Sequence, residues 1–228
     1  MKEKINNIVI ENVPVEIGTS GHVENTYIVY DTQNNFGVII DPGDKAEQIV
    51  SEVNKDNIEI KYIILTHTHL DHFGALEQLQ KVYDVDILVN RNDVDGFNDD
   101  NKNCIGYIDV KKQNIDITKV KAVEDGQKLS LGNIEFEFIH TPGHTSGSMC
   151  IYEKTSNVLF TGDTIFAKYY GRTDLTSGSF DDMKKSIKKL FDRFSNVIIY
   201  PGHDKSCNID TAKKRINLLV AIKEGENN

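Results

Sequence analysis

Metal-ligand side chains are concentrated in one short stretch of this chain. Residues 66–72 (THTHLDH) contain three of the seven histidines, together with Asp71. The stretch follows the apolar residues 62–65, which are typical of a buried strand. His67 and His69, two positions apart in an extended segment, should point to the same side. Because neutral imidazole and carboxylate groups bind zinc, iron or manganese, the stretch predicts a metal site.

Three later blocks offer candidates for further ligands. His144 lies in TPGHT, Asp163 in FTGDT and His203 in YPGHD. Each block follows an apolar stretch and contains a glycine, which lets the backbone approach a buried site closely. A lone histidine after a strand is usually structural or solvated. HxHxDH followed by three such blocks in this order is a far more specific signal, and it predicts a site assembled from several strand ends.

The elements that must position these side chains can be read from the apolar pattern. Strands are predicted at residues 25–30, 36–40, 61–66, 86–89, 134–139, 148–152, 158–161 and 197–200, the first two forming a hairpin. Apolar stripes predict helices near residues 46–53, 75–83, 183–194 and 209–220, with Asp44 as the cap of the first. Along the chain, the predicted strands come first and later strands alternate with helices. This order indicates sheets covered by helices, in one domain over residues 1–228.

The polar segment 90–125 fits this pattern poorly. A loop of that length inside a compact domain is usually functional or mobile. Its DVDG stretch, 93–96, has part of a calcium-loop pattern, but Arg91 and Lys102 stand where such a loop needs acidic ligands. Calcium binding is therefore not expected there.

Composition narrows the class of partner. The formal net charge of the 228 residues is −9, which argues against nucleic-acid binding. No apolar run is long enough to span a bilayer, and the first residues lack a signal-peptide pattern, so we expect no membrane association. Three scattered cysteines indicate a reducing compartment, so a cytoplasmic protein is expected. A small-molecule substrate is the expected partner, and the oligomeric state stays open.

Five blocks along the chain resemble those of the metallo-β-lactamase fold superfamily. They are DPG at 41–43, THTHLDH, TPGH, TGD and PGH, and they extend from residue 41 to residue 203. The resemblance implies an α+β fold, an αββα four-layer sandwich with two mixed sheets flanked by helices, and two divalent metal ions at one edge. It implies that Asp163 bridges the metals and that Asp41 orients a ligand. The first metal would be bound by His67, His69 and His144, and the second by Asp71, His72 and His203.

Within that superfamily, residues 162–179 (GDTIFAKYYGRTDLTSGS) resemble the glyoxalase II-like hydroxyacylglutathione hydrolases. Only 25 residues follow His203, so the chain is more similar to their short, single-domain relatives. This resemblance implies hydrolysis of a thioester by a hydroxide shared between the metals, with Asp71 and Asp163 as catalytic residues. Zinc is the first expectation for the metal, with iron or manganese as alternatives.

Other functions share most of these residues. Persulfide dioxygenases have a similar GRTD stretch and hold one iron, at positions matching His67, His144 and Asp163. Lactonases are a third branch, and a metal-binding module without activity is the non-enzymatic alternative. No G-x-S-x-G elbow or phosphate-binding loop supports another chemistry.

Residues beyond the predicted ligands carry weaker signals. Tyr169, Tyr170 and Arg172 follow Asp163 closely and could contact substrate, although Arg172 could instead pair with Asp174 to hold the loop. His22 is expected to be solvated and His140 to be structural.

Overall fold

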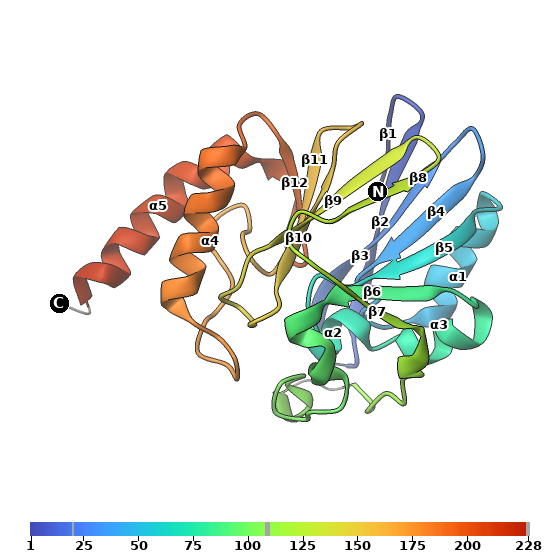
Figure 1. Ribbon diagram of the computed structural model, residues 1–228, viewed down its shortest axis with the longest axis horizontal. Helices are drawn as coiled ribbons and strands as arrows, with labels where there is room; N and C mark the ends of the chain where they lie inside the picture. The colour runs from blue at the N-terminus through green and yellow to red at the C-terminus, as the bar shows by residue number, and fades with distance from the viewer. Residues whose placement is uncertain (20, 108–109, 227–228) are drawn as a thin grey trace.

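Two mixed β-sheets lie face to face, and helices cover the outer face of each (Figure 1). The computed structural model describes residues 1–19, 21–107 and 110–226. The first sheet has the order β1-β2-β3-β4-β5-β6-β7. Its strands are β1 (Lys2–Ile5), β2 (Ile8–Ile17), β3 (His22–Asp31), β4 (Phe36–Ile40), β5 (Glu59–Ile64), β6 (Asp86–Asn90) and β7 (Val120–Val123). Neighbours are antiparallel up to β4 and parallel from β4 to β7.

The second sheet has the order β13-β12-β11-β10-β9-β8. Its strands are β8 (Lys128–Leu131), β9 (Ile134–His140), β10 (Met149–Glu153), β11 (Val158–Gly162), β12 (Ile198–Pro201) and β13 (Cys207–Asn208). The pair β11 and β12 is parallel, and the other neighbouring pairs are antiparallel. Both sheets are thus mixed, as the family resemblance implied.

Helices α1 (Ala46–Lys55), α2 (Leu70–Phe73) and α3 (Leu76–Val82) cover the first sheet, while α4 (Phe180–Arg193) and α5 (Ile209–Glu226) cover the second. Three apolar clusters fill the interfaces between these layers. The middle one lies between the sheets, where Phe136 and Phe138 of β9 meet Ile40 and Ile64 of the first sheet. The αββα sandwich is therefore confirmed. Among the described residues, no helix has the length and apolarity needed to cross a membrane.

The predicted hairpin and all the other predicted strands are present, but the first sheet is larger than expected. Strands β1 and β2 were missed, although Ile8, Ile10, Val13 and Val15 of β2 are buried. The glutamates and Pro14 within this run interrupt its apolar pattern, so the sequence gives only a weak strand signal there. Strands β7, β8 and β13 were also missed, because strands of 4, 4 and 2 residues are too short to show a clear pattern.

Asp44 does not cap α1, which corrects the prediction. The residue before the helix is Lys45 in a left-handed conformation (φ 53°), and no side chain caps the first turn. The Asp44 carboxylate instead accepts hydrogen bonds from the backbone N–H groups of Gly18 (2.9 Å) and Lys45 (2.6 Å). Asp44 thus holds the turn between β2 and β3 rather than the helix.

The polar segment 90–125 is structured over most of its length. It contains three 3₁₀ helices, η1 (Arg91–Phe97), η2 (Ile105–Tyr107) and η3 (Ile117–Lys119), followed by β7. Residues 108 and 109 lie outside the described part of the chain. Buried Asp93 and Phe97 anchor η1 beneath the loops that follow β5 and β9.

Candidate active site

The seven predicted ligands come from four separated parts of the chain that meet at one edge of the two sheets. His67 and His69 follow β5, and Asp71 and His72 lie in α2. The loop between β9 and β10 carries His144, while Asp163 and His203 come one and two residues after β11 and β12. All are buried except Asp163 and His203, which are partly exposed. Strand ends therefore position the site, as the sequence predicted.

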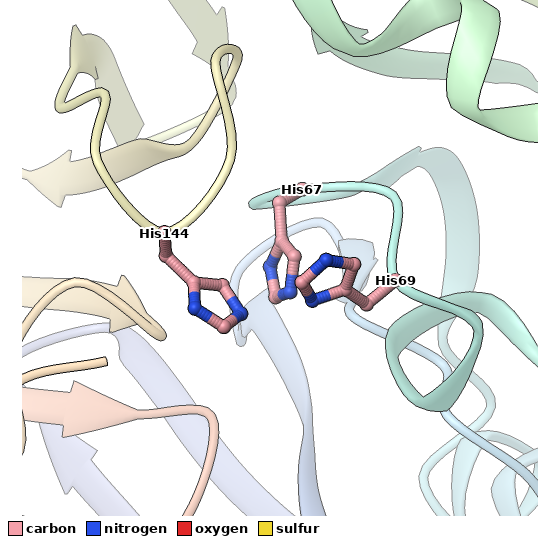
Figure 2. Close-up of side chains that lie close together, drawn as sticks. All are labelled: His67, His69 and His144. Atoms are coloured by element: carbon pink, nitrogen blue, oxygen red, sulfur yellow. The ribbon is translucent and has the colours of Figure 1, made fainter. Parts of the chain in front are cut away.

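Three histidines form what we call the first cluster, namely His67, His69 and His144 (Figure 2). Their ring centroids are 4.7 Å apart for His67 and His69, 4.8 Å for His67 and His144, and 4.5 Å for His69 and His144. The rings are almost perpendicular to one another, so they cannot stack. Each turns a nitrogen toward a common point.

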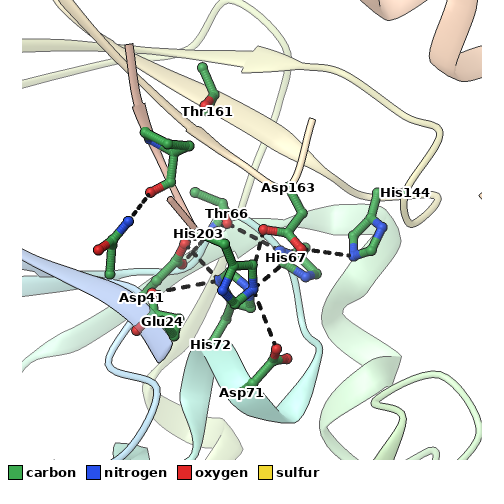
Figure 3. Close-up of polar contacts among 12 residues, drawn as sticks. Glu24, Asp41, Thr66, His67, Asp71, His72, His144, Thr161, Asp163 and His203 are labelled. Atoms are coloured by element: carbon green, nitrogen blue, oxygen red, sulfur yellow. Dashed lines mark hydrogen bonds and ion pairs between the residues drawn. The ribbon is translucent and has the colours of Figure 1, made fainter. Parts of the chain in front are cut away.

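Asp71, His72 and His203 form the second cluster, and Asp163 lies between the two (Figure 3). Asp163 Oδ1 is 3.5 Å from His72 Nε2, and Asp163 Oδ2 is 3.5 Å from His144 Nε2 and 3.6 Å from His203 Nε2. His203 Nε2 is also 3.6 Å from Asp71 Oδ2. One carboxylate thus faces histidines of both clusters.

These separations fit metal ligands better than hydrogen-bonded partners. They exceed the usual 2.7–3.2 Å of an N–H···O hydrogen bond. With bonds of 2.0–2.1 Å, two ligands of one tetrahedral zinc lie about 3.4 Å apart. The Nε2 atoms of His67, His69, His72 and His144 and Oδ1 of Asp163 are buried without a hydrogen-bond partner. Buried polar atoms are rarely left in that state, so the geometry fits divalent cations between them.

Asp41 occupies the orienting position that the sequence suggested. Its Oδ1 accepts a hydrogen bond from Thr66 N (2.7 Å), and its Oδ2 accepts one from Thr66 Oγ1 (2.6 Å) and lies 3.1 Å from His72 Nδ1. With Nδ1–H donating to Asp41, His72 directs Nε2 toward Asp163. The backbone of Asp41 is left-handed (φ 49°), an uncommon conformation for a residue other than glycine.

Two further histidines are oriented by backbone carbonyls. His144 Nδ1 lies 2.8 Å from the carbonyl oxygen of Arg172, and His203 Nδ1 lies 2.8 Å from that of Val23. A carbonyl can only accept, so each Nδ1 must carry the hydrogen. In the neutral form of each ring, Nε2 is therefore the lone-pair nitrogen, and it faces Asp163.

Asp93 connects two of the loops that carry the first cluster, and its role was not foreseen. Its carboxylate accepts hydrogen bonds from Thr68 N (3.2 Å), Thr145 Oγ1 (2.7 Å) and Gly147 N (2.7 Å). Both oxygens of Asp93 therefore accept hydrogen bonds from protein donors. The spacing of this aspartate from its partners carries no local signal in the sequence.

Glu24 and His22, both at the start of β3, also lie against the site. Glu24 is fully buried; its Oε2 accepts a hydrogen bond from Thr26 Oγ1 (3.1 Å), and its Oε1 lies 3.9 Å from His72 Nδ1. His22 Nε2 lies 3.6 Å from Asp71 Oδ2. Neither residue belongs to a motif, so Glu24 was not predicted. His22 is solvent-exposed as expected, and it also lies next to Asp71. His140 is structural as expected, with Nε2 2.9 Å from the carbonyl oxygen of Ser146.

The electrostatics differ between the two clusters. Burial lowers the pKa of His67 well below its usual value and that of His69 to about 3, helped by the neighbouring histidines. Burial would lower the pKa of His203 as well, but the negative charges of Asp163 and Asp71 raise it to about 10. Burial raises the pKa of Glu24 well above its usual value, and the nearby Asp41 carboxylate adds to the effect.

A cavity of about 560 Å³ opens over both clusters. Tyr107, Phe166, Tyr169 and Tyr170 contribute aromatic walls, and Arg172 lies on the same lining. The Arg172 guanidinium also donates two hydrogen bonds of 2.8 Å to Asp174. The pairing expected for Arg172 is therefore present together with its place on the cavity wall.

Comparison with known proteins agrees with this geometry. Residues 20–203 match the sequence profile of the metallo-beta-lactamase superfamily. This chain belongs to that superfamily. The family match explains why the buried histidines and aspartates converge at one sheet edge, since its members are metal-dependent hydrolases or related enzymes. Divalent metal binding is thus a property of the family to which this chain belongs.

Individual relatives cover most of the chain. Hydroxyacylglutathione hydrolase GloC of Haemophilus influenzae is 31% identical over 213 residues, which cover 90% of this chain and 95% of GloC. The probable polyketide biosynthesis zinc-dependent hydrolase BaeB of Bacillus velezensis is 32% identical over 178 residues, covering 78% of this chain and 71% of BaeB. The crystal structure of TTHA1623 in a di-iron-bound form superposes with a TM-score of 0.76 at 25% identity, covering 90% of this chain and 99% of that one. The relatives thus include proteins described with zinc and with iron.

Proposed function

We propose that this protein is a dinuclear metal-dependent hydrolase that cleaves a thioester, with hydroxyacyl-thiols as the substrate class. The observation that carries the proposal is the position of Asp163, whose carboxylate faces His72, His144 and His203 at 3.5, 3.5 and 3.6 Å. The similarity to GloC over nearly the whole of both chains supports the substrate class.

In this proposal His67, His69 and His144 would hold the first metal, Asp71, His72 and His203 would hold the second, and Asp163 would serve both. Two divalent ions so held would supply a nucleophilic hydroxide near neutral pH and polarise the thioester carbonyl. Asp41 keeps His72 in the orientation that metal binding needs, as the carbonyl groups of Arg172 and Val23 do for His144 and His203. Zinc is the metal we propose first.

The chain's remaining contribution is to hold the substrate. The aromatic side chains of Tyr107, Tyr169 and Tyr170 would enclose the acyl and thiol portions, and they would limit access of bulk water to the carbonyl. Tyr170 and Arg172 are the two residues that we propose as direct substrate contacts.

The test is hydrolysis of a matched panel by protein purified without added metal. The panel contains a hydroxyacylglutathione, the same acyl group on a smaller thiol, and an acyl-homoserine lactone. We expect thioester turnover that is lost on chelation and restored by zinc. Oxygen consumption on glutathione persulfide by protein holding one iron would overturn the proposal in favour of a dioxygenase, and turnover of the lactone alone would overturn the thioester assignment.

A further inference from the structure

His22 lies beside the second cluster and belongs to none of the five motifs found in the sequence. His22 is the first residue of β3, and its side chain is 54% exposed. Its Nε2 atom lies 3.6 Å from Asp71 Oδ2, the same oxygen that lies 3.6 Å from His203 Nε2. The ring centroids of His22 and His203 are 4.4 Å apart, close to the spacing within the first cluster.

We infer that His22 is an additional metal-binding residue of this site, acting with Asp71 and His203 on the second metal. The inference rests on the proposed dinuclear function and adds a residue to it. Ligand atoms of these three side chains lie within 4.8 Å of one another. The 3.6 Å between His22 Nε2 and Asp71 Oδ2 exceeds a hydrogen bond and suits two ligands of one metal ion, whose coordination would then expand beyond four.

Backbone contacts at the end of β2 help to position His22. His22 is paired with Ile17 at the end of the β2–β3 ladder, so the strand register sets the direction of its side chain. The connecting turn begins at Gly18 (φ 55°), whose N–H donates to Asp44 Oδ2 and whose carbonyl accepts from Lys45 Nζ (3.2 Å). A side chain mounted on an anchored hairpin is suited to a precise contact.

The second metal would be more exposed to solvent than the first. The first cluster is buried, whereas His22 and His203 line both the cavity over the site and a second cavity of about 800 Å³ beside it. The second metal would therefore lie nearer to solvent, where an extra ligand from the hairpin offsets easier loss of the ion. Removal of His22 should weaken that ion and spare the first.

The test compares zinc affinities of the wild-type protein, His22→Ala and the control Glu16→Gln by competition with a chromogenic chelator. Glu16 is an exposed residue of the same hairpin and faces none of the metal-binding atoms described. We expect the second dissociation constant of His22→Ala to rise by on the order of tenfold or more. Loss of a residue that only hydrogen-bonds to a metal ligand already weakens metal affinity by that factor. The first constant, the melting temperature and both constants of the control should stay unchanged.

Each other outcome has a distinct meaning. If wild-type protein and His22→Ala bind two zinc ions with equal constants, the inference about His22 is wrong and the dinuclear proposal stands. An equal loss of zinc affinity at both sites would also overturn the inference about His22, because it would indicate a general change in the loop. Wild-type protein that binds only one ion would contradict the proposed function itself.

Discussion

Asp93 accepts a hydrogen bond of 2.7 Å from Thr145 Oγ1, and this contact joins η1 to the loop that carries His144. The same carboxylate accepts from Thr68 N, between His67 and His69. A buried acid outside the metal site therefore sets the spacing of the first cluster. Burial raises the pKa of Asp93 even though three hydrogen bonds favour its ionised form.

Asp93→Asn should weaken the first metal. The NH2 group of the amide faces either Thr68 N or Gly147 N, which are both donors, so at least one hydrogen bond is lost inside a buried site. We expect metal affinity to fall by about 10–100-fold and the free energy of unfolding to fall by about 1–3 kcal/mol. Chelator competition and denaturant unfolding measure the two effects. Asp95→Asn in the same 3₁₀ helix is the control, because its pair with Lys102 is exposed. Unchanged metal affinity in Asp93→Asn would contradict the positioning role.

Gly202→Ala should disturb the second cluster by sterics alone. A Cβ atom at this position would lie 2.5 Å from Asp163 Oδ1 and 2.6 Å from His72 Cε1. We expect the variant to be purified with less than half the metal of the wild-type protein, measured by elemental analysis. Gly106→Ala is the matched control, since no described atom lies within 4 Å of a Cβ placed there. Full metal content in Gly202→Ala would mean that the close approach around Asp163 is not required.

Metal binding should release protons chiefly from the second cluster. In the metal-free protein the pKa of His203 is about 10, so a proton occupies it at neutral pH and must leave before a metal binds. His69, with a pKa of about 3, holds no proton to displace. Lowering the pH should therefore weaken the second metal before the first. Zinc titration calorimetry in two buffers of different ionisation enthalpy counts the protons, and equal release in both binding steps would argue against this difference.

Arg172 should act on substrate binding rather than on metal content. Its side chain lines the cavity, whereas its contact with His144 uses the backbone carbonyl, which a substitution keeps. We expect Arg172→Ala to raise KM for a glutathione thioester several-fold with kcat and metal content little changed. Asp174→Asn tests the alternative that the pair only holds the loop. If both variants raise KM equally, Arg172 supports the loop and does not contact substrate.

The sequence predicted those parts of the site that lie in contiguous motifs. His67, His69, Asp71 and His72 come from one stretch, and the later histidines follow strands with clear apolar patterns. The roles of Asp93 and Glu24 could not be predicted from the sequence, because both act through contacts with residues distant in the chain. Asp93 and Thr145, for example, are 52 positions apart.

The fold was predicted to a similar extent and for similar reasons. The strands that follow a simple apolar run were found, whereas β2 was missed because Glu11, Pro14 and Glu16 interrupt its pattern. Asp44 was misassigned as a helix cap because its true partner, Gly18 N, belongs to a turn 26 residues earlier. Tertiary hydrogen bonds of this kind leave no periodic trace in a sequence.

The central claim is that Asp163 holds two metals together, and metal stoichiometry tests it most directly. Elemental analysis of wild-type protein and Asp163→Ala, both purified without added metal and compared at equal folded fraction, gives the number of ions per chain. We predict two divalent ions in the wild-type protein, and in Asp163→Ala a marked loss of metal together with thioesterase activity near background. Two ions and full activity in Asp163→Ala would contradict the account.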